Sequence, residues 1–167
     1  GNWLYTEDAT GTYRDSDGSD ASYSYALKDL KVGDMPQANL ALGITASPVE
    51  DSKVQLLYRY YALHYSNWSP TSREFSEGET PDRAQSWRSP KYGIVDLNAS
   101  YKLPFEFSGV KPELFLNVRN LLDAVYVQDA TDNSKYNGYG DKLHLAHNAE
   151  VFLGTPRYYN LGLSINF

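Results

Sequence analysis

The sequence predicts an all-β protein folded as an antiparallel up-and-down meander of about six strands. Two observations support this fold class. Apolar residues recur at every second position in six segments, and long connections between these segments alternate with short ones. In addition, no stretch has the 3.6-residue period of an amphipathic helix. The 167 residues are enough for one domain of ordinary size, and we expect a single domain over residues 1–167.

The predicted strands cover residues 3–13, 36–48, 53–65, 92–102, 112–127 and 159–167. Alternation is strictest in 36–48, 92–102 and 159–167, where one face is apolar and the other is small or polar. It is weakest in 3–13. Whether ASYSYAL, residues 21–27, forms an additional strand stays open at this point.

The connections run long, short, long, short, long, over residues 14–35, 48–52, 66–90, 104–110 and 131–148. Transmembrane β-barrels have short turns on the periplasmic side and long loops on the extracellular side. A soluble β-sandwich has no reason to keep that order, because both of its ends face the same solvent. The pattern therefore favours a membrane barrel, and because single-chain barrels start at eight strands, six strands indicate part of a larger one.

Composition excludes several function classes. The formal net charge of -6 disfavours a nucleic-acid partner. The absence of cysteine excludes disulfides, a thiolate metal site and a cysteine nucleophile. The 15 tyrosines suit membrane interfaces, carbohydrate or protein contact surfaces, or antiparallel sheets in general.

Several stretches resemble the C-terminal part of a TonB-dependent outer-membrane receptor. They are VGDMPQANLALGI, NWSPTSREF, SWRSPKYGIVDLNASYKLP, LFLNVRNLLDAVYV and GTPRYYNLGLSINF, which follow one another in the order of the family and span nearly the whole chain. The matching positions of the fourth stretch are Asn117, Val118, Asn120, Leu121, Asp123 and Tyr126. The chain departs from the family pattern at Leu122, where an aromatic residue is usual, and in the Thr-Pro pair between Gly154 and Arg157.

The resemblance implies that this chain is about the last six strands of a 22-stranded barrel in the bacterial outer membrane. Such receptors import a scarce small-molecule ligand (a ferric siderophore, a vitamin or an oligosaccharide) with energy coupled through TonB. The implied partners are outer-membrane lipid, the barrel-assembly machinery, the ligand and a plug domain that connects to TonB; we expect the plug and the TonB box to be absent from this chain. The implied assembly signal is Tyr159, Leu161, Leu163, Ile165 and Phe167. No cofactor is implied.

Candidate ligand-binding residues are the aromatic side chains of the predicted outer loops, namely Tyr23, Tyr25, Trp68, Trp87, Tyr136 and Tyr139. They could line a vestibule that captures the ligand, or they could pack the loops over the barrel mouth; the sequence does not choose between these two roles. The ligand itself is also left open.

Other polar motifs favour structural roles. The row Asn117, Arg119, Asn120 and Asp123 shows no nucleophile or acid–base pair, so we expect a lumen-facing polar row and no enzyme. HLAH, residues 144–147, offers two histidines without a third ligand, so a solvated loop is favoured over a metal site. Solvated turns are also expected for the acidic runs 15–20 and 74–82.

Two alternatives from other classes remain. A soluble all-β carbohydrate- or protein-binding module predicts no asymmetry of loop length. A small complete outer-membrane barrel predicts at least eight strands.

Overall fold

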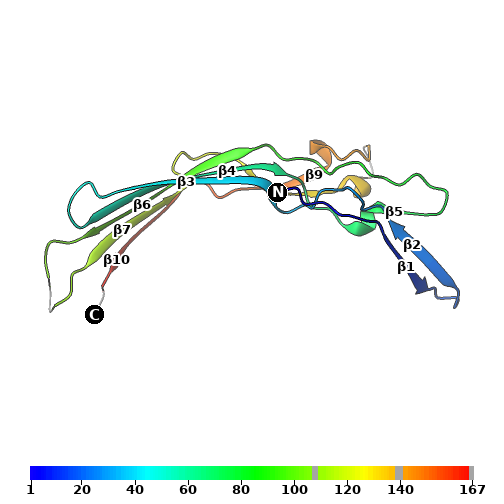
Figure 1. Ribbon diagram of the computed structural model, residues 1–167, viewed down its shortest axis with the longest axis horizontal. Helices are drawn as coiled ribbons and strands as arrows, with labels where there is room; N and C mark the ends of the chain where they lie inside the picture. Colours follow the sequence, from blue (N-terminus) through cyan, green and yellow to red (C-terminus); the bar gives the residue numbers. More distant parts are fainter. Residues whose placement is uncertain (107–108, 138–140, 166–167) are drawn as a thin grey trace. The chain divides into compact units, whose positions relative to one another are not determined.

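A computed structural model describes residues 1–106, 109–137 and 141–165, and it confirms an all-β fold with antiparallel sheets (Figure 1). The strands are β1 (Ala9–Arg14), β2 (Asp20–Tyr25), β3 (Pro36–Ala46), β4 (Ser52–His64), β5 (Glu74–Phe75), β6 (Tyr92–Lys102), β7 (Glu113–Arg119), β8 (Val127–Asp132), β9 (Ala149–Leu153) and β10 (Tyr158–Ser164). Three short 3-10 helices are η1 (Pro70–Arg73), η2 (Ser134–Tyr136) and η3 (Ala146–Asn148). No helix among the described residues has the length and apolar character needed to cross a membrane.

The chain forms two compact units. Unit 1 contains residues 1–38, 62–90 and 127–152, and unit 2 contains residues 39–61, 91–126 and 153–167. Unit 1 holds most of the segments that the sequence predicts as long connections.

Unit 2 is built on a five-stranded antiparallel sheet in the order β10-β7-β6-β4-β3. Its register aligns the apolar positions of neighbouring strands: Leu56 pairs with Leu97, Leu97 with Val118, and Val118 with Tyr159. Directly opposed residues of antiparallel strands point to the same face. The alternation of each strand therefore adds up to one apolar face across the sheet.

That apolar face is largely uncovered within the chain. Ile44 is 75% exposed and Leu161 is 67% exposed, and several other residues of the same face are exposed as well: Leu40, Leu42, Leu56, Tyr58, Tyr101, Leu114, Tyr159 and Leu163. An exposed apolar patch of this kind is rare on soluble monomers and is typical of surfaces that contact a partner protein or a membrane.

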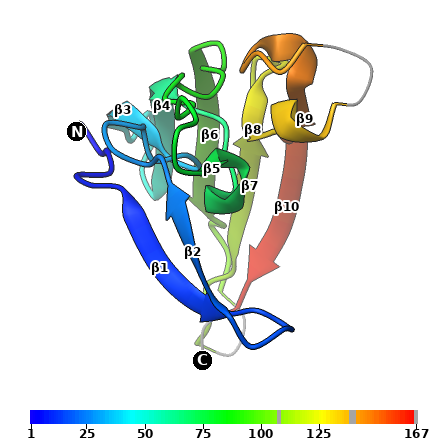
Figure 2. The ribbon, with the colours of Figure 1, turned by 90° about the vertical axis from the view of Figure 1, so that its right-hand side faces the viewer.

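Unit 1 contains β1, which the sequence predicts within residues 3–13, β2, which it left open, and β5, β8 and β9, which it did not predict. The β1–β2 hairpin, which pairs on with β5, and the β8–β9 pair lie within it, and Figure 2 shows the strands of each pair side by side. Its small core consists of Leu27, Leu30 and Trp68. The described residues therefore contain ten strands, where the sequence predicts about six.

Two of these differences have local causes. The predicted strand 3–13 begins only at Ala9, and β2 then forms within residues 21–27, because the turn at residues 15–19 folds the chain back on itself. The predicted strand 112–127 breaks after Arg119, because Asn120 and Asp123 have positive φ values of 50° and 56°, which are incompatible with extended backbone.

Candidate functional site

The predicted aromatic ligand residues do not gather at one place. Tyr23 and Tyr25 pack together on β2, with ring centroids 5.0 Å apart. Trp68 is only 7% exposed and packs in the unit 1 core with Leu27 and Leu30, which favours the packing role for this residue. Trp87 is half-buried, Tyr136 is exposed on η2, and Tyr139 lies outside the described residues.

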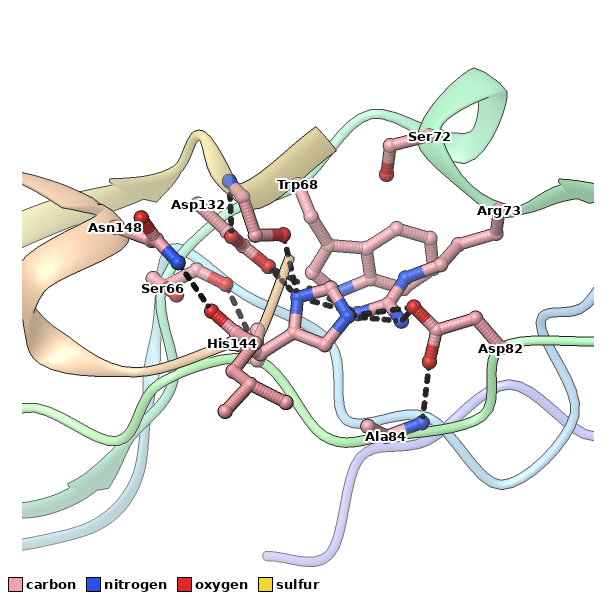
Figure 3. Close-up of polar contacts among 12 residues, drawn as sticks. Ser66, Trp68, Ser72, Arg73, Asp82, Ala84, Asp132, His144 and Asn148 are labelled. Carbon is pink, nitrogen blue, oxygen red and sulfur yellow. Dashed lines mark hydrogen bonds and ion pairs between the residues drawn. The ribbon is translucent and has the colours of Figure 1, made fainter. Parts of the chain in front are cut away.

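A cluster of four charged side chains, three of them buried, forms the most unusual feature of unit 1 (Figure 3). Its members are Arg73 of η1, Asp82, Asp132 of β8 and His144, and we call it the His144 cluster. The Arg73 side chain is fully buried, with its guanidinium Cζ 5.4 Å from the centre of the Trp68 ring. The cluster joins segments that are far apart in the sequence.

The imidazole of His144 lies between the two carboxylates. Its Nε2 lies 2.7 Å from Asp82 Oδ2, and its Nδ1 contacts Asp132 Oδ2. Because ionised carboxylates only accept hydrogen bonds, both contacts are satisfied when both ring nitrogens carry a proton. The Asp132 hydrogen bond, opposed by burial and aided by Asp82, raises the pKa of His144 above its usual value.

Arg73 also approaches this imidazole, with Nη1 2.8 Å from Nε2. Two donors cannot share a hydrogen bond, so in the protonated cluster Nη1 donates instead to Asp82 Oδ2, 3.0 Å away. Two cations and two carboxylates then balance, which makes burial of Arg73, Asp132 and His144 tolerable, while Asp82 stays half-exposed. The pKa of Asp132 would be raised by its burial, but hydrogen bonds from His144 and Ser134 hold it below the usual range.

The cluster resembles a hydrolytic Ser-His-Asp relay but lacks an accessible nucleophile. Ser134 Oγ lies 2.8 Å from His144 Nδ1, and Asp82 lies at the opposite ring nitrogen. However, Ser134 is buried, and Asp132 competes for the same nitrogen. An attack on substrate needs an exposed hydroxyl, so the geometry fits a structural cross-link between segments.

The expectation of a solvated HLAH loop is wrong for His144, which is buried, and right for His147, which is exposed and pairs with Asp141 at 3.0 Å. Asp82 likewise belongs to the cluster, although the sequence placed it in a solvated acidic turn. Within residues 1–106, 109–137 and 141–165, no group of three or more His, Asp or Glu side chains is arranged to hold a metal ion.

Unit 2 has its own buried charge, on the face of the sheet opposite the apolar one. Asp96 of β6 is fully buried and accepts hydrogen bonds from Arg59 of β4, from Arg119 of β7 and from the backbone N–H of Asn120. Gln55 and Asn98 extend this polar face with a side-chain hydrogen bond of 3.3 Å. Of the expected polar row, Arg119 bonds to Asp96 on the neighbouring strand β6, whereas Asn120 and Asp123 lie in the turn that follows β7.

The motif positions around Asn120 build the turn that follows β7. The Asn120 side chain accepts from Ala124 N–H and donates to the carbonyls of Ala124 and Thr155. Asp123 accepts from the N–H of Arg157, 2.9 Å away. Leu121 donates its N–H to Val95, and the Tyr126 ring lies over Gly154. Asn117 and Val118 precede the turn within β7.

The predicted assembly-signal residues lie on the terminal strand as expected from their parity. Tyr159, Leu161 and Leu163 pair with Val118, Leu116 and Leu114 of β7 and are exposed on the apolar face. Ile165 follows β10 and is also exposed, and Phe167 lies outside the described residues.

Comparison of the chain with protein families, curated proteins and solved structures gave no match. The sequence motifs did not reveal the His144 cluster, because Arg73, Asp82 and Asp132 are separated from one another by loops and β-strands. The only signal was a pair of histidines in a loop.

Proposed function

We propose that this chain is the C-terminal part of the β-barrel of a TonB-dependent outer-membrane receptor, which captures and imports a scarce ligand. The observation that carries the proposal is the exposed apolar face of the unit 2 sheet. Its leucines alternate in register over five strands, which is the pattern of a lipid-facing barrel wall. Outer-membrane lipid is then the material that covers this face.

The opposite face supports the same proposal. A barrel lumen is polar, and here the face carries Asp96 with its two arginines, together with Gln55 and Asn98. In a soluble sandwich, by contrast, the apolar face would be packed against a second sheet and the polar face would meet solvent.

The two ends of the unit 2 sheet also differ. Short turns, at residues 47–51 and 103–112, join β3 to β4 and β6 to β7. The connections from β4 to β6 and from β7 to β10 are longer and lie largely within residues 62–90 and 127–152 of unit 1. In this assignment the short turns are periplasmic and unit 1 is formed by the extracellular loops.

The open edges of the sheet favour a larger barrel. Within the described residues β10 pairs only with β7, and β3 is the last strand at the other edge. Unpaired backbone groups are costly in lipid, and barrels remove them by closing the sheet. The proposed receptor supplies the missing strands, the plug domain and the contact with TonB.

Site-specific labelling tests the lipid-facing wall, and the chain is suited to it because it contains no cysteine. We would make Leu42→Cys and Leu161→Cys on the apolar face, with Thr45→Cys and Asn160→Cys as matched controls on the polar face. Each variant carries an environment-sensitive fluorophore and is reconstituted into vesicles that contain a lipid-attached quencher. We expect strong quenching at positions 42 and 161 and weak quenching at 45 and 160.

The soluble binding module predicts a different result. A monodisperse chain without detergent, with no quenching at any of the four positions, would mean that the apolar face is packed within protein and would overturn the membrane assignment. A small complete barrel predicts the same labelling pattern, but its sheet would close into a barrel without strands from outside this chain.

A further inference from the structure

The β1–β2 hairpin presents a row of three tyrosines on one face. Its register pairs Ala9 with Tyr25, Gly11 with Tyr23 and Tyr13 with Ala21. Each tyrosine therefore faces a glycine or an alanine across the strands. On its other side Tyr25 pairs with Glu74 of β5, and the opposite face of the hairpin carries threonine, serine and charged residues.

The rings form a continuous aromatic surface. Tyr13 and Tyr23 have centroids 6.3 Å apart and planes tilted by 32°, and Tyr23 and Tyr25 are 5.0 Å apart with a tilt of 33°. A Cβ atom on Gly11 would stand 2.3 Å from the Tyr23 hydroxyl and 2.4 Å from its ring carbon Cζ. The Tyr23 ring therefore lies flat across Gly11, which requires the absence of a side chain there.

The row is reachable from solvent. Tyr13 is 51% exposed, and Tyr23 and Tyr25 are half-buried. Only Tyr25 also packs against the Leu27–Leu30–Trp68 core. A rigid aromatic surface anchored at one end presents its rings with little loss of side-chain entropy on binding.

Charge narrows the class of ligand. Unit 1 contains 15 acidic and eight basic residues, a formal charge of −7, whereas unit 2 contains six acidic and seven basic residues, a formal charge of +1. The hairpin turn adds Asp15 and Asp17, and on the opposite hairpin face Asp20 pairs with Arg14. A negative field of this kind opposes the approach of anionic chelates, phosphates and acidic glycans.

We propose that Tyr13, Tyr23 and Tyr25 form a stacking platform for a neutral oligosaccharide. The C–H faces of pyranose rings pack on the aromatic faces, and the sugar hydroxyls bond to the phenol groups at the ring tips. The proposal deepens the uptake function by naming the substrate class. It rests on that function for the fate of the ligand, whereas binding to the hairpin is measured separately.

The test measures binding of maltohexaose, cellohexaose and xylohexaose to the full 167-residue chain in detergent, by calorimetry at millimolar sugar, with hexagalacturonate as the anionic counterpart. We expect at least one neutral hexasaccharide to bind and hexagalacturonate to bind far more weakly. Tyr23→Ala should weaken binding by roughly tenfold, the upper range for loss of one aromatic contact. Tyr23→Phe, which keeps the ring, should retain most of the affinity.

Two further variants separate the platform from the fold. Gly11→Ala removes no ring but displaces Tyr23, so it should weaken binding as Tyr23→Ala does, whereas Thr12→Ala on the opposite hairpin face should leave binding unchanged. Circular dichroism of each variant checks that the sheets are intact. The same loss in Thr12→Ala as in Tyr23→Ala would overturn the proposal.

The ligand class is tested by the remaining outcomes. Absence of binding by all three neutral sugars, equal or tighter binding of hexagalacturonate, or binding that Tyr23→Ala and Tyr23→Phe leave unchanged would each overturn the platform. None of these results affects the lipid-quenching pattern at positions 42 and 161, so failure of the platform and failure of the membrane assignment are distinguishable.

Discussion

The two units are stabilised in opposite ways. Unit 1 buries more polar side chains than apolar ones and places a fully buried arginine against two aspartates and a histidine. Unit 2 is a regular sheet with one apolar face, on which Leu42, Ile44 and Leu161 remain exposed. Unit 1 therefore depends on specific side-chain hydrogen bonds, whereas unit 2 depends on the backbone hydrogen bonds of its sheet and leaves one apolar face exposed.

We expect the greatest loss of stability when the buried cation of unit 1 is removed. Arg73→Met removes the buried cation and leaves Asp82 and Asp132 without it, which should cost about 3 to 5 kcal/mol of unfolding free energy. The matched control is Arg83→Met, because the Arg83–Asp8 pair of 2.6 Å is partly exposed and screened by solvent, so its loss should cost far less. Hydrogen exchange of unit 1 amides measures both.

An equal loss in the two arginine variants would mean that burial does not distinguish the His144 cluster from an ordinary surface ion pair. The two units would then differ in their net charge but not in how their interiors are stabilised.

A charged residue on the apolar face of unit 2 should have different effects on stability in water and in lipid. Leu42→Arg should change stability by less than about 0.5 kcal/mol in water, because Leu42 is exposed there. In lipid vesicles it should cost about 2 to 4 kcal/mol, the range for a cation near the middle of a barrel wall. Thr45→Arg, on the opposite face, should show no such dependence on lipid. Denaturant titrations with and without vesicles measure both variants, and equal behaviour of the two would contradict a lipid-facing role.

The regular sheet of unit 2 was the most predictable part of the fold. Period-two alternation in residues 36–48, 92–102 and 159–167 predicted β3, β6 and β10, because each strand buries or exposes one whole face. The break inside 112–127 was not visible in the alternation, since it depends on the positive φ values of Asn120 and Asp123. Turn geometry set by side-chain hydrogen bonds leaves little trace in hydropathy.

Unit 1 was predicted poorly for a related reason. Its contacts join residues that are distant in sequence, such as Arg73 with His144, so no local spacing announces them. The alternation of small and aromatic residues in ASYSYAL did raise the possibility of β2, but the pairing that creates the tyrosine row required Gly11 and Tyr13 from a weakly alternating segment.

Unit 2 is tightly packed where the Tyr126 ring lies against Gly154, although its apolar face is exposed. Gly154→Ala would place a Cβ 1.9 Å from the Tyr126 ring, so the ring must move, at a cost of about 1 to 3 kcal/mol. Gly43→Ala is the matched control, because its nearest neighbour would be Leu57 at 3.6 Å, an ordinary contact. Chemical denaturation should separate the two variants clearly. Indistinguishable midpoints would show that the Tyr126 ring moves without cost.

The stability of unit 1 should also depend modestly on pH, through His144 and Asp132. Because the folded pKa of His144 is raised by the Asp132 hydrogen bond, protonation stabilises unit 1 fully below the ordinary pKa of 6.5. That stabilisation is lost as pH rises through the higher folded value. The lowered pKa of Asp132, which hydrogen bonds from His144 and Ser134 maintain against burial, acts at the other limb, where stability falls as pH drops below 3.8 through the folded pKa.

The alkaline loss should be modest, because a neutral His144 keeps one N–H and can still donate to one of the two aspartates. Hydrogen exchange across this pH range should show it in the amides around His144, and His144→Asn should abolish it. His147→Asn, at an exposed histidine, is the control and should leave the profile unchanged. The amides of β6 and β7 should not respond, since the three histidines of the chain, at positions 64, 144 and 147, all belong to unit 1. A parallel response in both sets of amides would mean that the two units unfold together and that their different interiors do not act independently.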